Sequence, residues 1–498
     1  MTSEQRPLNE WALERDAGAL FSFVDSICRH CHSAGESPSY LKSSKKFFKY
    51  INELGDATKE YLSTFPSKKP NEPRLYQYYR QRLETIRSGW FEIHLLIKSA
   101  ADADTLNVPY ALVEAFTRRL NRVQGFEDTT FAIFHIDELN YWEIPASEIK
   151  QTTDKFKRYI PDPPQFPNVG MIGIPYSQSS SLYLNCLIAH EMGHYVFEKR
   201  EVKEKLLPYI EAALEDVIGK HFEAANDVTL QWSKDRLAAW AEELFCDLFA
   251  VWLIGPSYSF AYIELFGLTA ILDPTDPSGF SVTTGAGSAI FSAEHPADLL
   301  RLKQHVSLLQ ELGWWGEVDE IKSHYVNVLR SSAKVNQDIF EYRHKEMPLA
   351  SETIHAFLRL VPQVSIRLAD SMKGPGGRKL DTGLASYVKF SACIGQYLER
   401  AVVPSTVFQE DEHWYPDDVA ILNASMKFYL ESLETLMDGI KGQKKFLAGH
   451  RSRWIKRVEA LAGKAIEDYQ LLAGETGAVR IDGSFKRADL RSPESADL

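Results

Sequence analysis

The sequence predicts an α+β fold that is predominantly α-helical, with one small sheet in its middle third. Three observations lead to this fold class. Helical periodicity fills both ends of the chain, two short β-type runs lie between them, and 498 residues, 44% of them hydrophobic, suffice to bury several cores. We expect a helical region over 1–125, an α+β core over 126–310, a second helical region over 311–474 and a disordered polar tail over 475–498.

The N-terminal region should consist of amphipathic helices. Apolar residues recur at helical spacing over Trp11–His32, Arg74–Ala100 and Val108–Val123. Turn-forming residues at Asn71–Pro73 and Asp102–Asn107 separate these helices. We therefore expect the N-terminal region to be helical.

The middle of the chain begins with two predicted strands. Thr129–Ile136 is rich in β-branched and aromatic residues, and Val169–Ile174 is a second apolar run that Pro175 ends. A polar run then suits the start of a helix over Leu182–Lys199. Further helices are expected over Val202–Lys220 and Lys234–Ile254.

The longest apolar stretch, Leu248–Leu272, is interrupted at Gly255-Pro256 and contains Glu264. We interpret it as two buried helices rather than a membrane span, because proline breaks a helix and a span needs about 20 continuous apolar residues. The following segment, 273–292, is rich in Gly, Pro, Ser and Thr and predicts a loop. Such a loop could act as a lid. From His295 onward the pattern is helical again.

Composition narrows the class of protein. A net charge of −12 disfavours binding to nucleic acid or to an anionic membrane. The five cysteines are too few and too scattered for a disulfide framework, which favours a reducing compartment. The first residues are polar and lack an apolar signal segment. We expect a soluble cytoplasmic protein.

The chemistry is carried by His190-Glu191-Met192-Gly193-His194. Two histidines four residues apart on a helix share one face, so both imidazoles can bind one zinc ion at about 2.0–2.1 Å. Glu191 lies beside that face, where it could take a proton from a metal-activated water and pass it to the leaving amine. The alternative is a pair of ordinary surface or core histidines.

A catalytic zinc needs a third protein ligand. Glu243 and Asp247 lie one turn apart on an otherwise apolar helix, where unpaired carboxylates would be costly. We expect Glu243 to be that ligand and Asp247 to accept the outer N–H of a zinc-bound histidine. Glu242 is the alternative ligand. The alternative to a metal site is that Glu243 and Asp247 lie on a solvated helix edge, where they form salt bridges.

The set His190–His194 followed by Glu243 and Asp247 resembles the gluzincin metallopeptidases, whose pattern is HExxH and a later ExxxD. The resemblance implies a zincin-like core, zinc held by His190, His194 and Glu243, Glu191 as general base, and Asp247 orienting a histidine. The helices of this pattern are 49 residues apart here, counted from His194 to Glu243, so extra structure must lie between them.

A third segment, His295-Pro-Ala-Asp-Leu-Leu-Arg301, is similar to the HPxxxxRI segment of the CAAX prenyl protease and heat-shock membrane peptidase family. This chain departs from that family at Glu294 and Cys246, where Thr and Ala are usual, and it lacks the family's membrane helices. The similarity covers roughly residues 165–305. The flanking helical regions resemble no family that we can name.

Several further roles follow as expectations. His295 could donate to a tetrahedral oxyanion, or it could simply cap a helix that starts at Pro296. Arg301 could pair with a carboxylate of the Glu243 helix or with substrate. If the second strand is an edge strand, its residues Gly173 and Ile174 could pair with substrate backbone; the alternative is an interior strand.

Two cysteine patterns are weaker signals. Cys28-Arg-His-Cys31-His32 matches the haem-attachment pattern CxxCH, but an amphipathic helix with incidental polar residues is the better interpretation. Cys186 lies one turn before His190 and could be a ligand, although a small buried cysteine is the simpler interpretation.

The sequence thus predicts a cytoplasmic zinc metallopeptidase that acts on a peptide or protein and binds neither nucleic acid nor membrane. Its helical flanks could shape access or bind a regulatory protein. Two alternatives stay open: a zinc-containing regulatory or interaction protein without catalysis, and a hydrolase of non-peptide amides. A fourth protein ligand such as Cys186 would indicate a structural zinc rather than a catalytic one.

Overall fold

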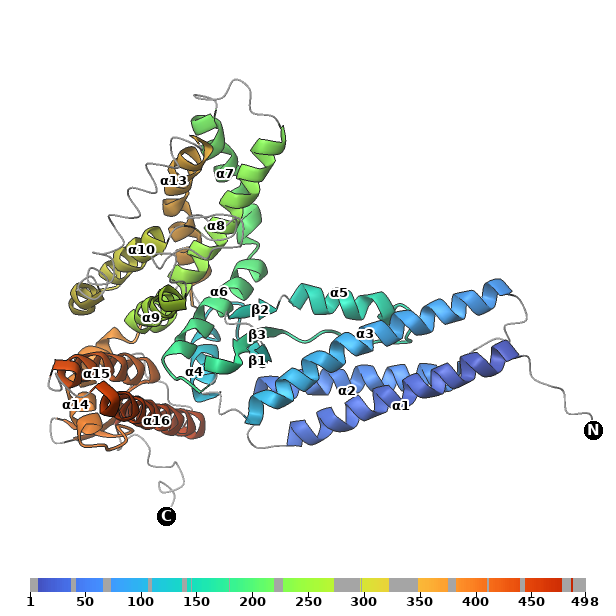
Figure 1. The fold of residues 1–498 in the computed structure, drawn as a ribbon, viewed down its shortest axis with the longest axis horizontal. Coiled ribbons are helices and arrows are strands. Elements are labelled where there is room, and N and C mark those ends of the chain that lie inside the picture. The colour runs from blue at the N-terminus through green and yellow to red at the C-terminus, as the bar shows by residue number, and fades with distance from the viewer. Residues whose placement is uncertain are drawn as a thin grey trace, which may run out of the picture. The chain divides into compact units, whose positions relative to one another are not determined.

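A computed structural model shows a mostly helical chain (Figure 1). It describes residues 8–36, 42–65, 73–105, 110–136, 141–144, 146–178, 180–218, 227–272, 296, 298–321, 348–374, 382–409, 412–438, 444–476 and 485–486. The chain forms two compact units. The first comprises residues 1–110 and 128–180, and the second comprises residues 111–127 and 181–498. The predominantly helical fold class is confirmed.

Unit 1 is a helical bundle with a small sheet. Its helices are α1 (Leu8–Glu36), α2 (Lys42–Ser63), α3 (Pro73–Thr105) and α5 (Ala146–Lys157). Helix α1 packs on α2 and α3, and α3 packs on α5. Fully buried side chains such as Trp90 form their common core. The helices expected over Trp11–His32 and Arg74–Ala100 are present as α1 and α3, each longer at its ends by a few residues.

The sheet of unit 1 has the order β1-β3-β2. Strand β1 (Thr130–Ile136) runs parallel to β3 (Val169–Pro175), and β2 (Trp142–Ile144) pairs with β3 antiparallel. The two expected strands are therefore present, and the short strand β2 was not foreseen. Strand β1 packs on α2 and α3 within this unit.

Of the two alternatives for the second strand, an edge strand and an interior strand, the structure shows the interior strand. Strand β3 is central: Gly173 pairs with Phe134 on one side and with Trp142 on the other. Its backbone at Gly173 is thus already occupied and cannot take up a substrate strand, and Ile174 is fully buried. The run of apolar residues in β3 is the pattern of a strand that is buried on both faces.

The residues of the core predicted over 126–310 are divided between the two units. The strands form a core with the N-terminal helices, where Phe47 of α2 meets Phe134 of β1 edge to face at 5.8 Å. The motif helix and everything after it belong to unit 2. Local patterns predicted each element, but they did not tell which elements bury one another.

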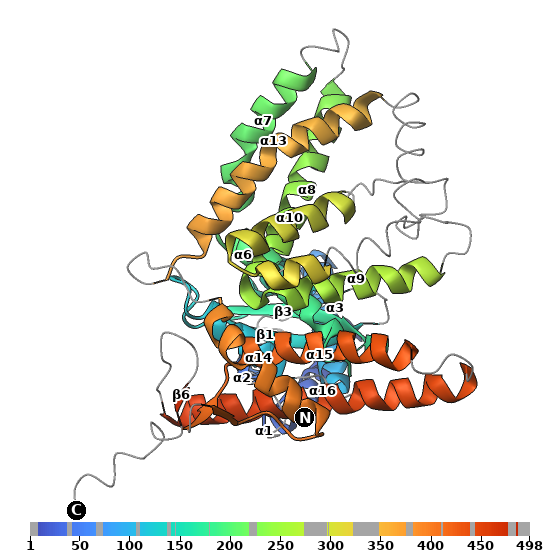
Figure 2. The same cartoon turned by 90° about the vertical axis from the view of Figure 1, so that its left-hand side faces the viewer.

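Unit 2 is built around one long helix, α8 (Asp227–Ile254). Helices α6, α7, α9, α10 and α13 all pack against α8, as Figure 2 shows for most of them. The elements that surround it are η2 (Leu184–Leu187), α6 (Ile188–Lys199), α7 (Val202–Ile218), α9 (Pro256–Leu272), α10 (Asp298–Glu311) and α13 (Pro348–Ser371). The rest of the unit comprises α4 (Tyr110–Leu120), α14 (Leu384–Glu399), α15 (Asp418–Asp438) and α16 (Lys444–Thr476).

The long apolar stretch forms two helices, as expected, and it turns at Gly255, whose φ is +70°. Asn423 of α15 holds both sides of this turn. Its side-chain amide donates to the carbonyl of Ile254 at 2.9 Å, and its carbonyl accepts from the backbone N–H and hydroxyl of Ser257 at 2.8 and 2.7 Å. Among the described helices, none has the length and apolarity needed to cross a bilayer.

The C-terminal part of unit 2 is not wholly helical, contrary to expectation. Strands β4 (Val407–Gln409), β5 (Glu412–Tyr415) and β6 (Phe485–Lys486) form an antiparallel sheet. Strand β6 lies within the tail that was expected to be disordered, so that expectation was wrong for these two residues. These strands are too short to show periodicity. The predicted lid over 273–292 lies outside the described residues.

Candidate metal centre

The candidate site lies where α6 crosses α8. Gly193, in the middle of the motif, faces the backbone of Cys246: a Cβ added there would come within 2.7 Å of the Cys246 Cα. The two helices therefore approach at backbone distance, which only glycine allows. This close approach carries Glu243, one turn before Cys246, to the face of α6 that bears the two histidines.

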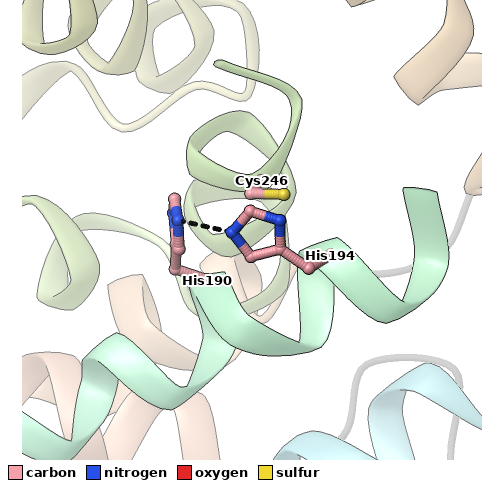
Figure 3. Close-up of side chains that lie close together, drawn as sticks. All are labelled: His190, His194 and Cys246. Carbon is pink, nitrogen blue, oxygen red and sulfur yellow. Dashed lines mark hydrogen bonds between the residues drawn. The ribbon is translucent and has the colours of Figure 1, made fainter. Parts of the chain in front are cut away.

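The side chains of His190, His194 and Glu243 bring their nitrogen and oxygen atoms together at this crossing. The Nε2 atoms of His190 and His194 are 3.2 Å apart, and Figure 3 shows the two rings facing each other. Glu243 places Oε2 at 3.4 Å from Nε2 of His190 and Oε1 at 3.6 Å from Nε2 of His194. Tetrahedral ligands at the zinc–nitrogen distance lie about 3.3–3.4 Å from one another. The side chains of His190, His194 and Glu243 thus form a triangle of ligand groups whose contacts are close to the spacing of zinc ligands.

The other ring nitrogens are held by carboxylates. Nδ1 of His190 lies 2.9 Å from Oδ1 of Asp247, and Nδ1 of His194 lies 3.0 Å from Oε1 of Glu242. A carboxylate only accepts, so each Nδ1 carries the hydrogen and each Nε2 is left to face the triangle. Glu242, which the sequence offered as an alternative ligand, thus contacts the outer side of His194.

Asp247 is the most crowded carboxylate of the site and is fully buried. Tyr258 donates its hydroxyl to Oδ1 at 2.5 Å, beside the Nδ1–H of His190. Arg301 donates from Nη2 to Oδ1 at 2.7 Å and from Nε to Oδ2 at 2.5 Å. His305 completes the set with Nε2 at 3.3 Å from Oδ2. The carboxylate is therefore fixed from both oxygens.

Arg301 contacts two carboxylates of α8, those of Asp247 and Glu243. Besides its two bonds to Asp247, it places Nη2 at 3.2 Å from Oε2 of Glu243. The side chain is 6% exposed. Of the two partners expected for Arg301, the structure shows the carboxylates of the Glu243 helix.

The electrostatics are those of a strongly coupled buried cluster. Burial by itself would lower the pKa of His190, but the contacts with Asp247 and Glu243 outweigh burial and raise that pKa to about 10. Burial would raise the pKa of both carboxyls, yet Arg301 and His190 hold the pKa of Asp247 and of Glu243 below their usual values. At neutral pH the metal-free cluster therefore holds ionised carboxylates and a proton on His190.

Glu191 follows His190 on α6 and is 7% exposed. Its negative charge contributes to raising the pKa of His194, which places it within electrostatic reach of the cluster. His295 lies outside the described residues. Gly173 and Ile174 belong to unit 1. The structure thus brings together His190, Glu191, His194, Glu243, Asp247 and Arg301 from the residues that the sequence singled out.

Sequence analysis missed His305 and Cys246 as residues of this site, and it placed Tyr258 either in the core or near an oxyanion rather than beside Asp247. Tyr258 and His305 contact Asp247, and Cys246 offers a sulfur within 4.8 Å of ligand atoms of His190 and His194. His305 could have been found, because it follows Arg301 by one helical turn and so shares its face. Cys246 could not, because its position one residue before Asp247 does not reveal which neighbours it has across the helix crossing.

The two cysteines near the motif differ in their surroundings. Cys186 donates its thiol to the carbonyl of Leu182 at 3.9 Å and belongs to the packing of η2. In Figure 3 the sulfur of Cys246 points away from the contact between the two Nε2 atoms. Burial raises the pKa of the Cys246 thiol well above its usual value. In the metal-free site both cysteines are therefore protonated at neutral pH.

Comparison with known proteins gave no match among family models, curated proteins or solved structures. The resemblance to gluzincins therefore rests on the motif residues themselves. The function has to be argued from the geometry and charge of the site.

Proposed function

We propose that this protein is a zinc-dependent peptidase with a gluzincin-type centre, in which His190, His194 and Glu243 are the ligands. One observation carries the proposal: side chains from two helices bring the Nε2 atoms of His190 and His194 within 3.2 Å of each other, with the two carboxylate oxygens of Glu243 at 3.4 Å from the first and 3.6 Å from the second. Three protein ligands and a vacant fourth direction are the arrangement of catalytic zinc. The side chain of His194 is 19% exposed, so the site is not sealed.

The charge of the cluster supports a divalent cation. The buried carboxylates Glu191, Glu243 and Asp247 face a single guanidinium, that of Arg301. Burial lowers the pKa of His305, so this imidazole adds no charge at neutral pH. Without the proton on His190, which an ion would displace, two negative charges are left over, and uncompensated buried charge is expensive. A divalent cation at the triangle would neutralise it.

The residues then have distinct tasks. When bound, zinc would polarise a carbonyl and acidify a water molecule. Glu191, adjacent to His190, would take the proton from the attacking water and deliver it to the departing amine. Asp247 and Glu242 would hold the imidazole rings through their Nδ1 hydrogens.

A second candidate is a structural zinc site without catalysis, and the nearness of Cys246 favours it. A thiolate bound to the same ion would close the fourth position. The sulfur would first have to turn toward the triangle. Cys246→Ala separates the two: the variant retains both zinc and activity if the site is catalytic and loses tight zinc binding if the thiolate is a ligand.

The test is metal analysis of the purified protein combined with cleavage of a peptide library, read by mass spectrometry. Wild type should hold one zinc per chain and cleave peptides. Glu191→Gln should keep the zinc and lose cleavage by a factor of about a hundred or more, because it removes the general base. His190→Ala should lose the zinc. Glu198→Gln, on the exposed side of the same helix, is the matched control and should change neither property.

Full activity in Glu191→Gln would overturn the mechanism. Absence of zinc from wild type that had been supplied with the ion would overturn the metal centre itself. A library of non-peptide amides run in parallel distinguishes an amidohydrolase from a peptidase, since both would respond alike to the Glu191 substitution.

A further inference from the structure

His305 occupies an unusual place for a histidine. It lies on α10, one turn after Arg301, and is 0% exposed. The aromatic rings of Tyr258 and Tyr262 flank it, each with its centroid 5.2 Å from the imidazole. A polar ring in such an apolar slot is costly unless both nitrogens have polar neighbours.

Both nitrogens do have such neighbours. Nδ1 lies 3.4 Å from the hydroxyl oxygen of Ser259, and Nε2 lies 3.3 Å from Oδ2 of Asp247. A hydroxyl can donate to Nδ1, whereas the ionised Asp247 can only accept. The imidazole is thereby set in the tautomer whose Nε2–H faces Asp247. A line of contacts runs from Ser259 through His305 and Asp247 to the ligand His190.

The two oxygens of Asp247 have different tasks in this line. Oδ1 accepts the Nδ1–H of His190 and so sets the plane of that ring. Oδ2 accepts from Nε of Arg301, and Nε2 of His305 lies 3.3 Å from the same oxygen. A carboxylate rotates about its last side-chain bond as one plate, so whatever holds Oδ2 also decides where Oδ1 points.

We infer that His305 is a positioning residue for the metal: it fixes the Asp247 carboxylate through Oδ2 and thereby aims the Nε2 of His190 at the ion. The inference rests on the proposed zinc centre. Arg301 also contacts Asp247, but it is shared with Glu243, which is itself a proposed ligand. His305 contacts Asp247 without contacting a ligand, so it acts on the metal only through the carboxylate.

The test uses three variants of the full chain. His305→Phe keeps a ring in the slot but removes both nitrogens. His305→Gln keeps an N–H group at the distance of Nε2. Leu309→Ala, in the next turn of the same helix and also fully buried, removes packing without touching the site. Each protein is stripped with a chelator, and its affinity for Zn²⁺ is measured by competition with a chelating dye.

We expect His305→Phe to weaken zinc binding by about tenfold, as outer partners of metal ligands do. His305→Gln should stay within about threefold of wild type. Leu309→Ala should lower the midpoint of thermal unfolding while leaving zinc affinity unchanged. With Co²⁺ in place of zinc, the visible absorption bands should change in the Phe variant and not in the Gln variant, because they report the arrangement of the ligands.

Equal affinity of wild type and His305→Phe would overturn the inference while leaving the zinc centre intact. So would an equal loss in Leu309→Ala, since the helix would then matter only as packing. Failure of wild type to bind either ion would overturn the proposed function and this inference together. The wild-type measurement therefore separates the two failures.

Discussion

Helices α6 and α1 each carry a pair of metal-ligating side chains at short spacing, and of these two pairs only that on α6 belongs to the proposed metal centre. On α6, His190 and His194 face carboxylates that contact both nitrogens of each ring. On α1, Cys28 and Cys31 are buried in the helical bundle, where Gly55 of α2 and the ring of Trp90 form the neighbourhood of Cys28. Spacing along a helix is thus a necessary condition for a metal site, and the side chains across the helix crossing decide whether such a site forms.

The two motifs also differ in the protonation of their surroundings. Burial raises the pKa of Cys28 to about 11 and that of Cys31 further, which keeps both as thiols, the form that does not bind metal. In the α6 motif, ionised carboxylates are already present and need a cation. The polar groups around the ligand pair, rather than the pair itself, therefore distinguish a metal centre from two side chains that only pack in a core.

The largest expected effect comes from removing the charge of Asp247. Asp247→Asn leaves Arg301 buried beside a neutral amide, and breaking such a buried pair costs about 3–5 kcal/mol. The matched change on α1 is Asp25→Asn, whose carboxylate is 36% exposed and pairs with Lys59 and Arg29. It should cost at most about 1 kcal/mol. Urea unfolding of the zinc-free proteins measures both, and equal losses would refute the contrast.

The next effect is the pH dependence of zinc affinity. In the metal-free protein the pKa of His190 is raised to about 10. At neutral pH its ring therefore carries a second hydrogen in addition to the one on Nδ1, and this second hydrogen is on Nε2, where the ion would bind. Zinc must displace this proton, so below pH 10 the apparent affinity should rise about tenfold for each pH unit, or about a hundredfold from pH 7 to pH 9. Dye competition at several pH values measures the slope. A flat profile would mean that His190 is already unprotonated.

These contrasts also show how far the sequence reaches. Spacing and composition suffice to predict the proposed ligands His190 and His194, the carboxylates Glu243 and Asp247, and the break at Gly255, because these features depend on neighbours close in sequence. The contacts of Tyr258 and His305 with Asp247 were not predicted, because both residues reach Asp247 from other helices.

The sheet teaches the same lesson. Both expected strands formed, yet β3 is central because the short β2 pairs with Gly173 and its neighbours. Nothing in the pattern of Val169–Pro175 itself announces a partner of three residues. Pairing and unit boundaries depend on which surfaces meet, and that information is spread over the whole chain.

A smaller effect is expected from the helix crossing itself. Gly193→Ala would press a Cβ against the backbone of Cys246, which cannot move as a side chain can, so α6 and α8 must separate. Such overpacking costs about 1–3 kcal/mol and should also weaken zinc binding, because Glu243 moves with α8. Gly463→Ala on α16 meets no atom within 4 Å and should stabilise by about 0.5–1 kcal/mol. Thermal unfolding with and without zinc distinguishes the two.

The smallest effect on the metal is expected from the α1 motif. Cys31→Ala removes a fully buried sulfur from the bundle and should cost about 1 kcal/mol of unfolding free energy, a typical value for a small core truncation. Its zinc content should equal that of wild type, because the thiols of α1 stay protonated and buried among apolar groups. Elemental analysis of Cys31→Ala beside His190→Ala makes the comparison direct. Loss of zinc from the cysteine variant would mean that helical spacing had been the deciding feature after all.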